Sequence, residues 1–170
     1  MKRGLLVVLL MGFFGLCGLG VLTLGWMWYQ DDRPPVQPIA FSHERHVSQV
    51  KLPCEHCHQN ARKGPQATVP PMSVCAACHA QMKTGNPEVL KLQSYLKEGR
   101  PVEWTKVHRL PWHVLFTHKR HLAAGVACQT CHGQVAVMPR MRKLRSLQMG
   151  WCVGCHRDKG ASRDCWTCHK

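Results

Sequence analysis

One short motif, Cys-x-x-Cys-His, occurs five times in this sequence and constrains its fold more than any other feature. Two thiols separated by two residues can reach the two vinyl groups of one haem, and the imidazole that follows can reach the iron as proximal ligand. The motifs therefore predict five covalently bound haem c groups. The predicted attachment residues are Cys54, Cys57, Cys75, Cys78, Cys128, Cys131, Cys152, Cys155, Cys165 and Cys168, and the predicted proximal ligands are His58, His79, His132, His156 and His169.

Structural zinc and disulfide bonds are the alternative uses of paired cysteines. Neither explains why a histidine directly follows all five pairs, so haem attachment is the favoured interpretation. It also accounts for the composition after residue 30, where aliphatic residues are scarce and an ordinary hydrophobic core would be underfilled. Small domains that lack a core usually recruit another means of holding the chain together.

The first thirty residues differ sharply from the rest. Leu5 to Tyr29 is a run without a charge, and at about 1.5 Å per helical residue it is long enough to cross a bilayer. Lys2 and Arg3 precede the run, which places the N-terminus in the cytoplasm. The sequence thus predicts a single-pass protein of a bacterial inner membrane with its haem domain in the periplasm.

A cleaved secretory signal is the alternative for this segment. The apolar run is longer than a typical signal core, and no small-x-small cleavage site lies near Gln30. Cys17 lies in the middle of the run after Leu16, so we interpret it as a packed apolar residue and not as a lipidation site.

Two histidine pairs stand in matching settings. The first frame, residues 41–47, reads Phe-Ser-His-x-x-His-Val, and the second frame, residues 116–122, reads Phe-Thr-His-x-x-His-Leu. Each frame precedes a haem motif by a short gap, so the chain contains an internal repeat. Histidines three residues apart on a helix have neighbouring side chains, which brings the irons they bind close together. We therefore predict His43, His46, His118 and His121 as distal ligands.

A fifth distal ligand must come from outside the two frames. His108 is the predicted residue, because it lies in an alternating, strand-like segment between the frames. His113, Met149 and Met138 remain open as alternatives. A methionine ligand would raise the reduction potential of its haem relative to a bis-histidine haem. His56 is predicted to be an exposed residue.

The predicted organisation is an anchor at 1–30, a Pro-rich linker at 31–38, a two-haem module with a helix at 39–98, an inter-module linker at 99–115 and a three-haem module at 116–170. The helix is signalled by Asn86 as N-cap, Pro87 in the first turn and Gly99 at its end. The fold class is that of a multihaem cytochrome c, mostly loops and short helices around haems, with one transmembrane helix.

The formal net charge of +14 would suit nucleic-acid binding. A periplasmic location makes that function implausible. Haem offers a better account, because each oxidised haem adds two propionates against an iron-porphyrin centre of about +1. Many of the lysine and arginine residues then offset propionate charge.

The frames and motifs resemble class III cytochromes, in which haem packing replaces a core. A closer likeness lies in residues 99–111, 116–133 and 149–157, which resemble the pentahaem membrane cytochrome subunit of alternative complex III and related quinone-linked complexes. That resemblance implies an integral membrane quinol-binding subunit and an iron-sulfur, molybdoenzyme-like subunit as partners, with a periplasmic acceptor such as a monohaem cytochrome. This chain departs from the family pattern at Arg109, where an acidic residue often follows the linker histidine.

Three functions compete. The favoured one is an electron-transfer subunit, not itself an enzyme, of a membrane quinol oxidoreductase complex. The second is a stand-alone quinol dehydrogenase cytochrome that feeds a periplasmic reductase, but a methionine two residues after a motif histidine, its hallmark, is absent. The third is a multihaem reductase, which needs an open iron position, whereas distal histidines are plentiful here.

Overall fold

The computed structural model describes residues 2–31 and 33–170. Met1 and Asp32, which fall in the predicted anchor and the predicted Pro-rich linker, lie outside the described residues. The chain divides into two compact units, residues 1–33 and residues 34–170. Each unit is described by itself.

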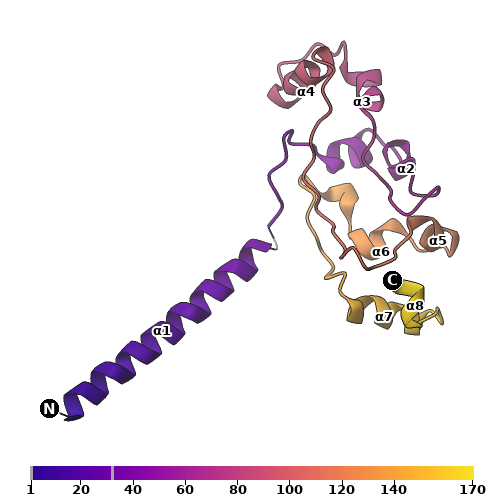
Figure 1. Cartoon of the computed structure of the whole chain (residues 1–170). Helices are drawn as coiled ribbons and strands as arrows, with labels where there is room; N and C mark the ends of the chain where they lie inside the picture. The colour runs from indigo at the N-terminus through magenta and orange to yellow at the C-terminus, as the bar shows by residue number, and fades with distance from the viewer. Residues whose placement is uncertain (1, 32) are drawn as a thin grey trace. The chain divides into compact units, whose positions relative to one another are not determined.

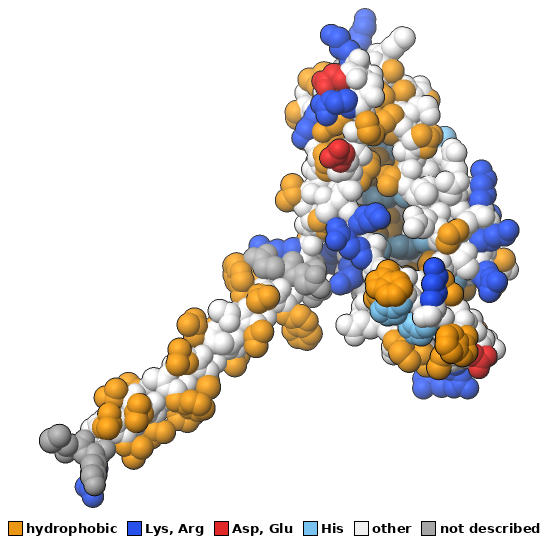
Figure 2. Space-filling view, viewed as in Figure 1, with side chains coloured by type: hydrophobic (Ala, Val, Ile, Leu, Met, Phe, Trp, Pro, Cys, Tyr) orange, Lys and Arg blue, Asp and Glu red, His pale blue; other side chains and the backbone are white. Residues whose placement is uncertain are grey.

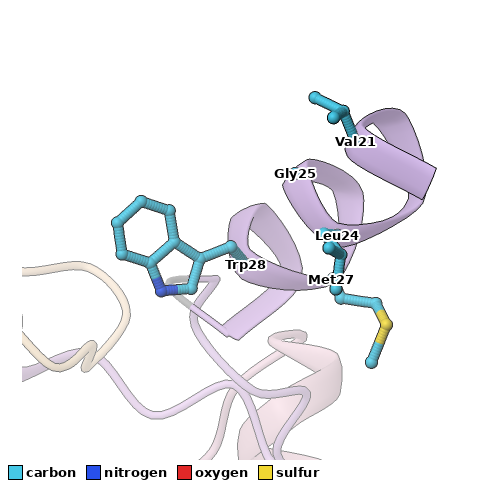
Figure 3. A pocket seen from close by; sticks show the side chains of 5 residues that line it. All are labelled: Val21, Leu24, Gly25, Met27 and Trp28. Carbon is cyan, nitrogen blue, oxygen red and sulfur yellow. The ribbon is translucent and has the colours of Figure 1, made fainter. Parts of the chain in front are cut away.

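The first unit is a single helix, α1 (Lys2–Asp31) (Figure 1). Its stretch Arg3–Tyr29 is 27 residues long and is apolar enough to cross a membrane. Large apolar side chains project from it all along its length (Figure 2). The shallow hollow on its surface is lined by residues from this one helix and encloses nothing (Figure 3); these are Val21, Leu24, Gly25, Met27 and Trp28.

The second unit consists of short helices and connecting loops (Figure 1). Its helical elements are η1 (Glu44–Gln49), α2 (Cys54–Cys57), α3 (Met72–His79), α4 (Pro87–Lys97), α5 (His118–Ala123), α6 (Cys128–His132), η2 (Val135–Val137), α7 (Met149–Asp158) and α8 (Cys165–Cys168). Within the described ranges no strand forms, and the one isolated bridge joins Val114 to His169. This architecture agrees with the fold class predicted from the motifs.

The hydrophobic core of the second unit is nearly absent. Among the described residues only four apolar side chains are buried, namely Ile39, Ala61, Val102 and Met138. A domain of this size normally buries most of the apolar surface of its chain. The protein part of this unit is therefore insufficient to hold it together by apolar burial alone.

Helix α4 follows the prediction from its cap residues. The Asn86 side chain accepts hydrogen bonds from the backbone N–H groups of Glu88 and Val89, which satisfies two free donors of the first turn. Gly99, just beyond the helix, has φ +64°, a backbone conformation that glycine adopts without strain. The Glu88 carboxylate also accepts a hydrogen bond from the Ala40 N–H, and this bond ties α4 to the segment before the first frame.

The segment between α4 and α5 runs back along the unit. Thr105 exchanges backbone hydrogen bonds with the Gln37 side chain, and further along the chain the Leu115 N–H donates to the Cys168 carbonyl at 2.7 Å. Figure 1 shows this segment passing from α4 to the end of the unit that holds α7 and α8. Its alternating sequence predicted a strand, but it has no neighbouring strand with which to pair.

Candidate haem sites

All five Cys-x-x-Cys-His motifs fold as short helical turns, in α2, α3, α6, α7 and α8. A helical turn brings residues three apart to the same face, so both thiols of each motif lie next to each other. None of the ten motif cysteines forms a disulfide within the described part of the chain.

The two histidine frames repeat one geometry. In the first frame the Phe41 ring stacks on His46 at 4.3 Å and meets His43 edge-on at 4.9 Å. In the second frame Phe116 lies 4.6 Å from His121 at an interplanar angle of 31°, and it meets His118 edge-on at 4.8 Å. The phenylalanine thus fixes the direction of both histidine rings in each frame.

Three distal candidates face a motif histidine across a similar distance. The ring centres are 6.0 Å apart for His46 and His79, 6.1 Å for His121 and His156, and 6.3 Å for His118 and His132. An iron between two imidazoles, with metal–nitrogen bonds of about 2 Å on each side, would hold the ring centres roughly 6 Å apart. These three pairs therefore fit bis-histidine haem ligation.

The remaining frame histidine, His43, lies near the proximal residue of the first motif. Burial lowers the pKa of His43 to about 4, and the nearby His58 and His46 add to this effect. The pKa of His132 is also lowered to about 4, first by burial and then by His108 and His118. Both imidazoles are therefore neutral at pH 7, which is the form that coordinates a metal.

Five of these histidines are oriented by a backbone carbonyl. A carbonyl oxygen can only accept, so Nδ1 carries the proton and donates, which leaves Nε2 free to bind iron. The distance from Nδ1 to the carbonyl oxygen is 2.6–2.9 Å in all five bonds, which run from His46 to Ser42, His58 to Thr68, His118 to Pro65, His121 to Thr117 and His156 to Ser162.

Three buried imidazole nitrogens have no hydrogen-bond partner among the described residues. They are Nδ1 of His43, Nδ1 of His79 and Nε2 of His108. Burying such a nitrogen without a partner costs free energy. If iron is bound through Nε2, as in the oriented histidines above, only the His108 atom among these three is an unpaired nitrogen of the kind that binds the metal.

His108 and His113 occupy different places. The His108 ring lies 4.5 Å from His132 at an interplanar angle of 83°, so it meets a proximal residue that already faces His118. The His113 ring lies 5.6 Å from His169 at 26°. The bridge between Val114 and His169 and a hydrogen bond from the Lys170 N–H to the His113 carbonyl fix this pair.

The other candidate residues are less well placed for an iron. Met138 is buried, and its carbonyl accepts a hydrogen bond from the Glu44 N–H. Met149 is exposed at the start of α7, and His56 is exposed as predicted. No sequence signal separates His113 from His108, because the choice depends on where the connecting segment passes.

Several motifs also lie side by side. Burial raises the pKa of the Cys57 thiol, and the nearby Cys75 thiol raises it further. In the same way burial and then the neighbouring Cys155 raise the pKa of Cys131. Thiols of different motifs therefore lie near enough to influence one another's charge.

Paired thiols on helical turns, opposed histidine rings and a nearly empty core define a multihaem c-type cytochrome, a protein that transfers electrons. The sequence model of the family described as cytochrome c7 and related cytochrome c matches residues 39–95 and 114–170. These two stretches, here called the first and second repeat, make up most of the chain. The chain belongs to this family.

A curated relative covers nearly the whole chain. The multihaem cytochrome c subunit of the menaquinone reductase of Nitratidesulfovibrio vulgaris is 29% identical over 181 residues, which covers 88% of this chain and 85% of the relative. That protein is, by its name, part of a quinone-linked enzyme.

Proposed function

We propose that the chain is a membrane-anchored pentahaem electron relay within a quinone-linked oxidoreductase complex. The observation that carries the proposal is the set of opposed imidazole rings about 6 Å apart beside Cys-x-x-Cys-His turns. Haem supplies the one-electron chemistry when it is bound. The motif cysteines would attach it, and the paired histidines would supply the ligands to its iron.

The proposal assigns one motif and one distal residue to each haem. The pairs are His58 with His43, His79 with His46, His132 with His118, His156 with His121, and His169 with His113. The attachment residues are the ten motif cysteines. His108 stays a candidate for the fifth distal position, although the ring geometry favours His113 at the last motif.

The anchor and location belong to the same proposal. The apolar stretch Arg3–Tyr29 is retained and crosses the inner membrane, and the haem domain lies in the periplasm. Haem attachment to Cys-x-x-Cys-His motifs requires that compartment. The domain boundaries proposed from the sequence, with a two-haem module at 39–98 and a three-haem module at 116–170, place both modules on that side.

The partners are inferred from the relative and from the resemblance to alternative complex III. Both are quinone-linked, so an integral membrane subunit that binds quinone is the first expected partner. An iron-sulfur, molybdoenzyme-like subunit and a periplasmic redox partner such as a monohaem cytochrome complete the assembly.

Two directions of electron flow are candidates. The resemblance to alternative complex III favours flow from quinol to a periplasmic acceptor. The name of the relative, a menaquinone reductase, favours flow from a periplasmic donor to the quinone. A stand-alone quinol dehydrogenase would need no partner subunit to reduce its haems.

Purification of the native protein in detergent tests these alternatives. We expect mass spectrometry of this chain to show five haem masses and low-temperature EPR to show only low-spin iron. We also expect co-purifying membrane and iron-sulfur subunits, and haem reduction by menaquinol or haem oxidation by menaquinone then gives the direction. A bare-chain mass would refute the haem assignment, and rapid quinol oxidation by the isolated chain would favour the stand-alone function.

A further inference from the structure

The two repeats are joined by reciprocal contacts. The loop that follows the first motif reaches the second frame, where the Gly64 and Pro65 carbonyls accept hydrogen bonds from the N–H groups of Lys119 and His118. The Pro65 carbonyl also accepts from His118 Nδ1 at 2.8 Å. The histidine helix of the second repeat is therefore held by the loop of the first motif.

The loop that follows the third motif makes the matching contact. The Met138 carbonyl accepts a hydrogen bond from the Glu44 N–H at 3.2 Å, and the Ala136 carbonyl accepts from the Ser48 hydroxyl. The first histidine helix is thus held by the third motif. This exchange places the first and third motifs at the junction of the repeats.

Side chains at the junction show the same proximity. The Pro65 carbonyl after the first motif holds His118, whose ring lies 6.3 Å from His132 of the third motif. Burial raises the pKa of the Cys128 thiol, and the nearby Cys54 thiol raises it further. Figure 1 shows α2 and α6 in the middle of the unit, with α3 and α4 at one end and α7 and α8 at the other.

The other motifs extend outward from this junction. His46 belongs to the frame of the first repeat and its ring lies 6.0 Å from His79, which joins that frame to the second motif. His118 and His121 lie on the same helix, α5, and face His132 and His156, which joins the third motif to the fourth. The fourth and fifth motifs, in α7 and α8, lie together at one end of the unit (Figure 1). The spatial order of the motifs is therefore second, first, third, fourth, fifth.

We propose that electrons cross between the repeats by passing between the site of His58 and the site of His132, in whichever direction the relay runs, and that the sites of His79 and His169 are the two ends of the relay. This inference rests on the proposed function, since it takes each motif to carry a haem. One electron passes between neighbouring sites in each step, and no bond to a substrate forms or breaks. A relay in sequence order would instead join the second site to the third.

Two matched double variants separate these paths. Cys54→Ala with Cys57→Ala removes the first site, and Cys75→Ala with Cys78→Ala removes the second. Each variant is purified in detergent, and a photoexcited ruthenium complex delivers on average less than one electron to each protein molecule. Electron exchange among the remaining four haems is then followed by optical absorption.

We expect removal of the first site to abolish fast exchange between the second site and the others, which then appears as a separate slow phase. Removal of the second site should leave all four remaining haems in fast exchange. The reverse result, with the slow phase in the variant that lacks the second site, would overturn the inference.

A direct measurement covers the case in which a variant does not fold. Cryo-electron microscopy of the intact native protein locates each iron next to its own motif. The inference requires the irons at His58 and His132 to be the shortest link between the repeats, and it fails if the iron at His79 is nearer to the second repeat. Fewer than five haem masses would instead count against the proposed function.

Discussion

The second histidine has nearly the same contacts in both frames, whereas the hydrogen bonding of the first histidine differs between them. His46 and His121 each donate Nδ1–H to the carbonyl four residues earlier and lie against a phenylalanine ring. His118 donates Nδ1–H to the Pro65 carbonyl of the other repeat, whereas Nδ1 of His43 has no partner within the described residues. The second position is thus fixed locally in both frames, whereas the first is oriented by the other repeat in the second frame only.

The repeats also differ in how many motifs follow each frame. A frame offers two distal histidines, which is enough for the two motifs of the first repeat. The second repeat has three motifs, and the ring opposite His169 belongs to His113, which directly precedes that repeat. An added motif therefore takes its distal candidate from the connecting segment, and the first repeat carries the capped helix α4 instead.

Loss of one motif should have the largest effect, and the effect should depend on the repeat. Cys128→Ala with Cys131→Ala removes the site that touches both frames, so we expect the free energy of unfolding to fall on the order of 5 kcal/mol, as when a large core side chain is lost. Cys75→Ala with Cys78→Ala at the edge should cost less. Thermal unfolding followed by circular dichroism measures both, and equal losses would contradict the difference between junction and edge.

The distal ligand of the last motif is tested by His113→Ala against His108→Ala. We expect His113→Ala to convert one haem to a high-spin form, because its iron loses an axial ligand. His108→Ala should leave every haem low-spin. EPR of the oxidised proteins measures this, and a high-spin signal only in the His108 variant would assign the position to His108.

The second histidine of each frame can be replaced by methionine to test whether the two frames are equivalent. His46→Met and His121→Met should each raise the reduction potential of one haem by on the order of 100 mV. The reason is that a methionine thioether stabilises ferrous iron relative to ferric iron more than a second imidazole does. The two shifts should be similar, since the local geometry is the same. Potentiometric titration measures them, and a shift in only one variant would show that the frames are not equivalent.

The smallest expected effect concerns the helix found only in the first repeat. Asn86→Ala removes the side-chain cap of α4 and should lower the free energy of unfolding by about 1 kcal/mol. Ser94→Ala, in the same helix, removes an exposed hydrogen bond to Lys91 and serves as the control. Denaturant unfolding compares the two, and a cost no greater than that of the control would argue against the cap.

The sequence was sufficient for features that depend on neighbouring residues. The five motifs, the frame histidines and the cap at Asn86 are all local patterns, and the structure places them on the turns and helix that such patterns favour. The relation of His113 to His169 is different, because it depends on a segment that runs the length of the unit. The same is true of the contact between the first and third motifs, which no spacing in the chain reveals.

The scarcity of buried side chains has a consequence for how such a chain can change over time. Only four apolar residues of the described chain are buried by other protein atoms, so the polypeptide alone restricts few positions by shape. In the haem-loaded protein the apolar side chains beside the motifs would pack against porphyrin, so tolerance to substitution should increase with distance from the motifs and frames.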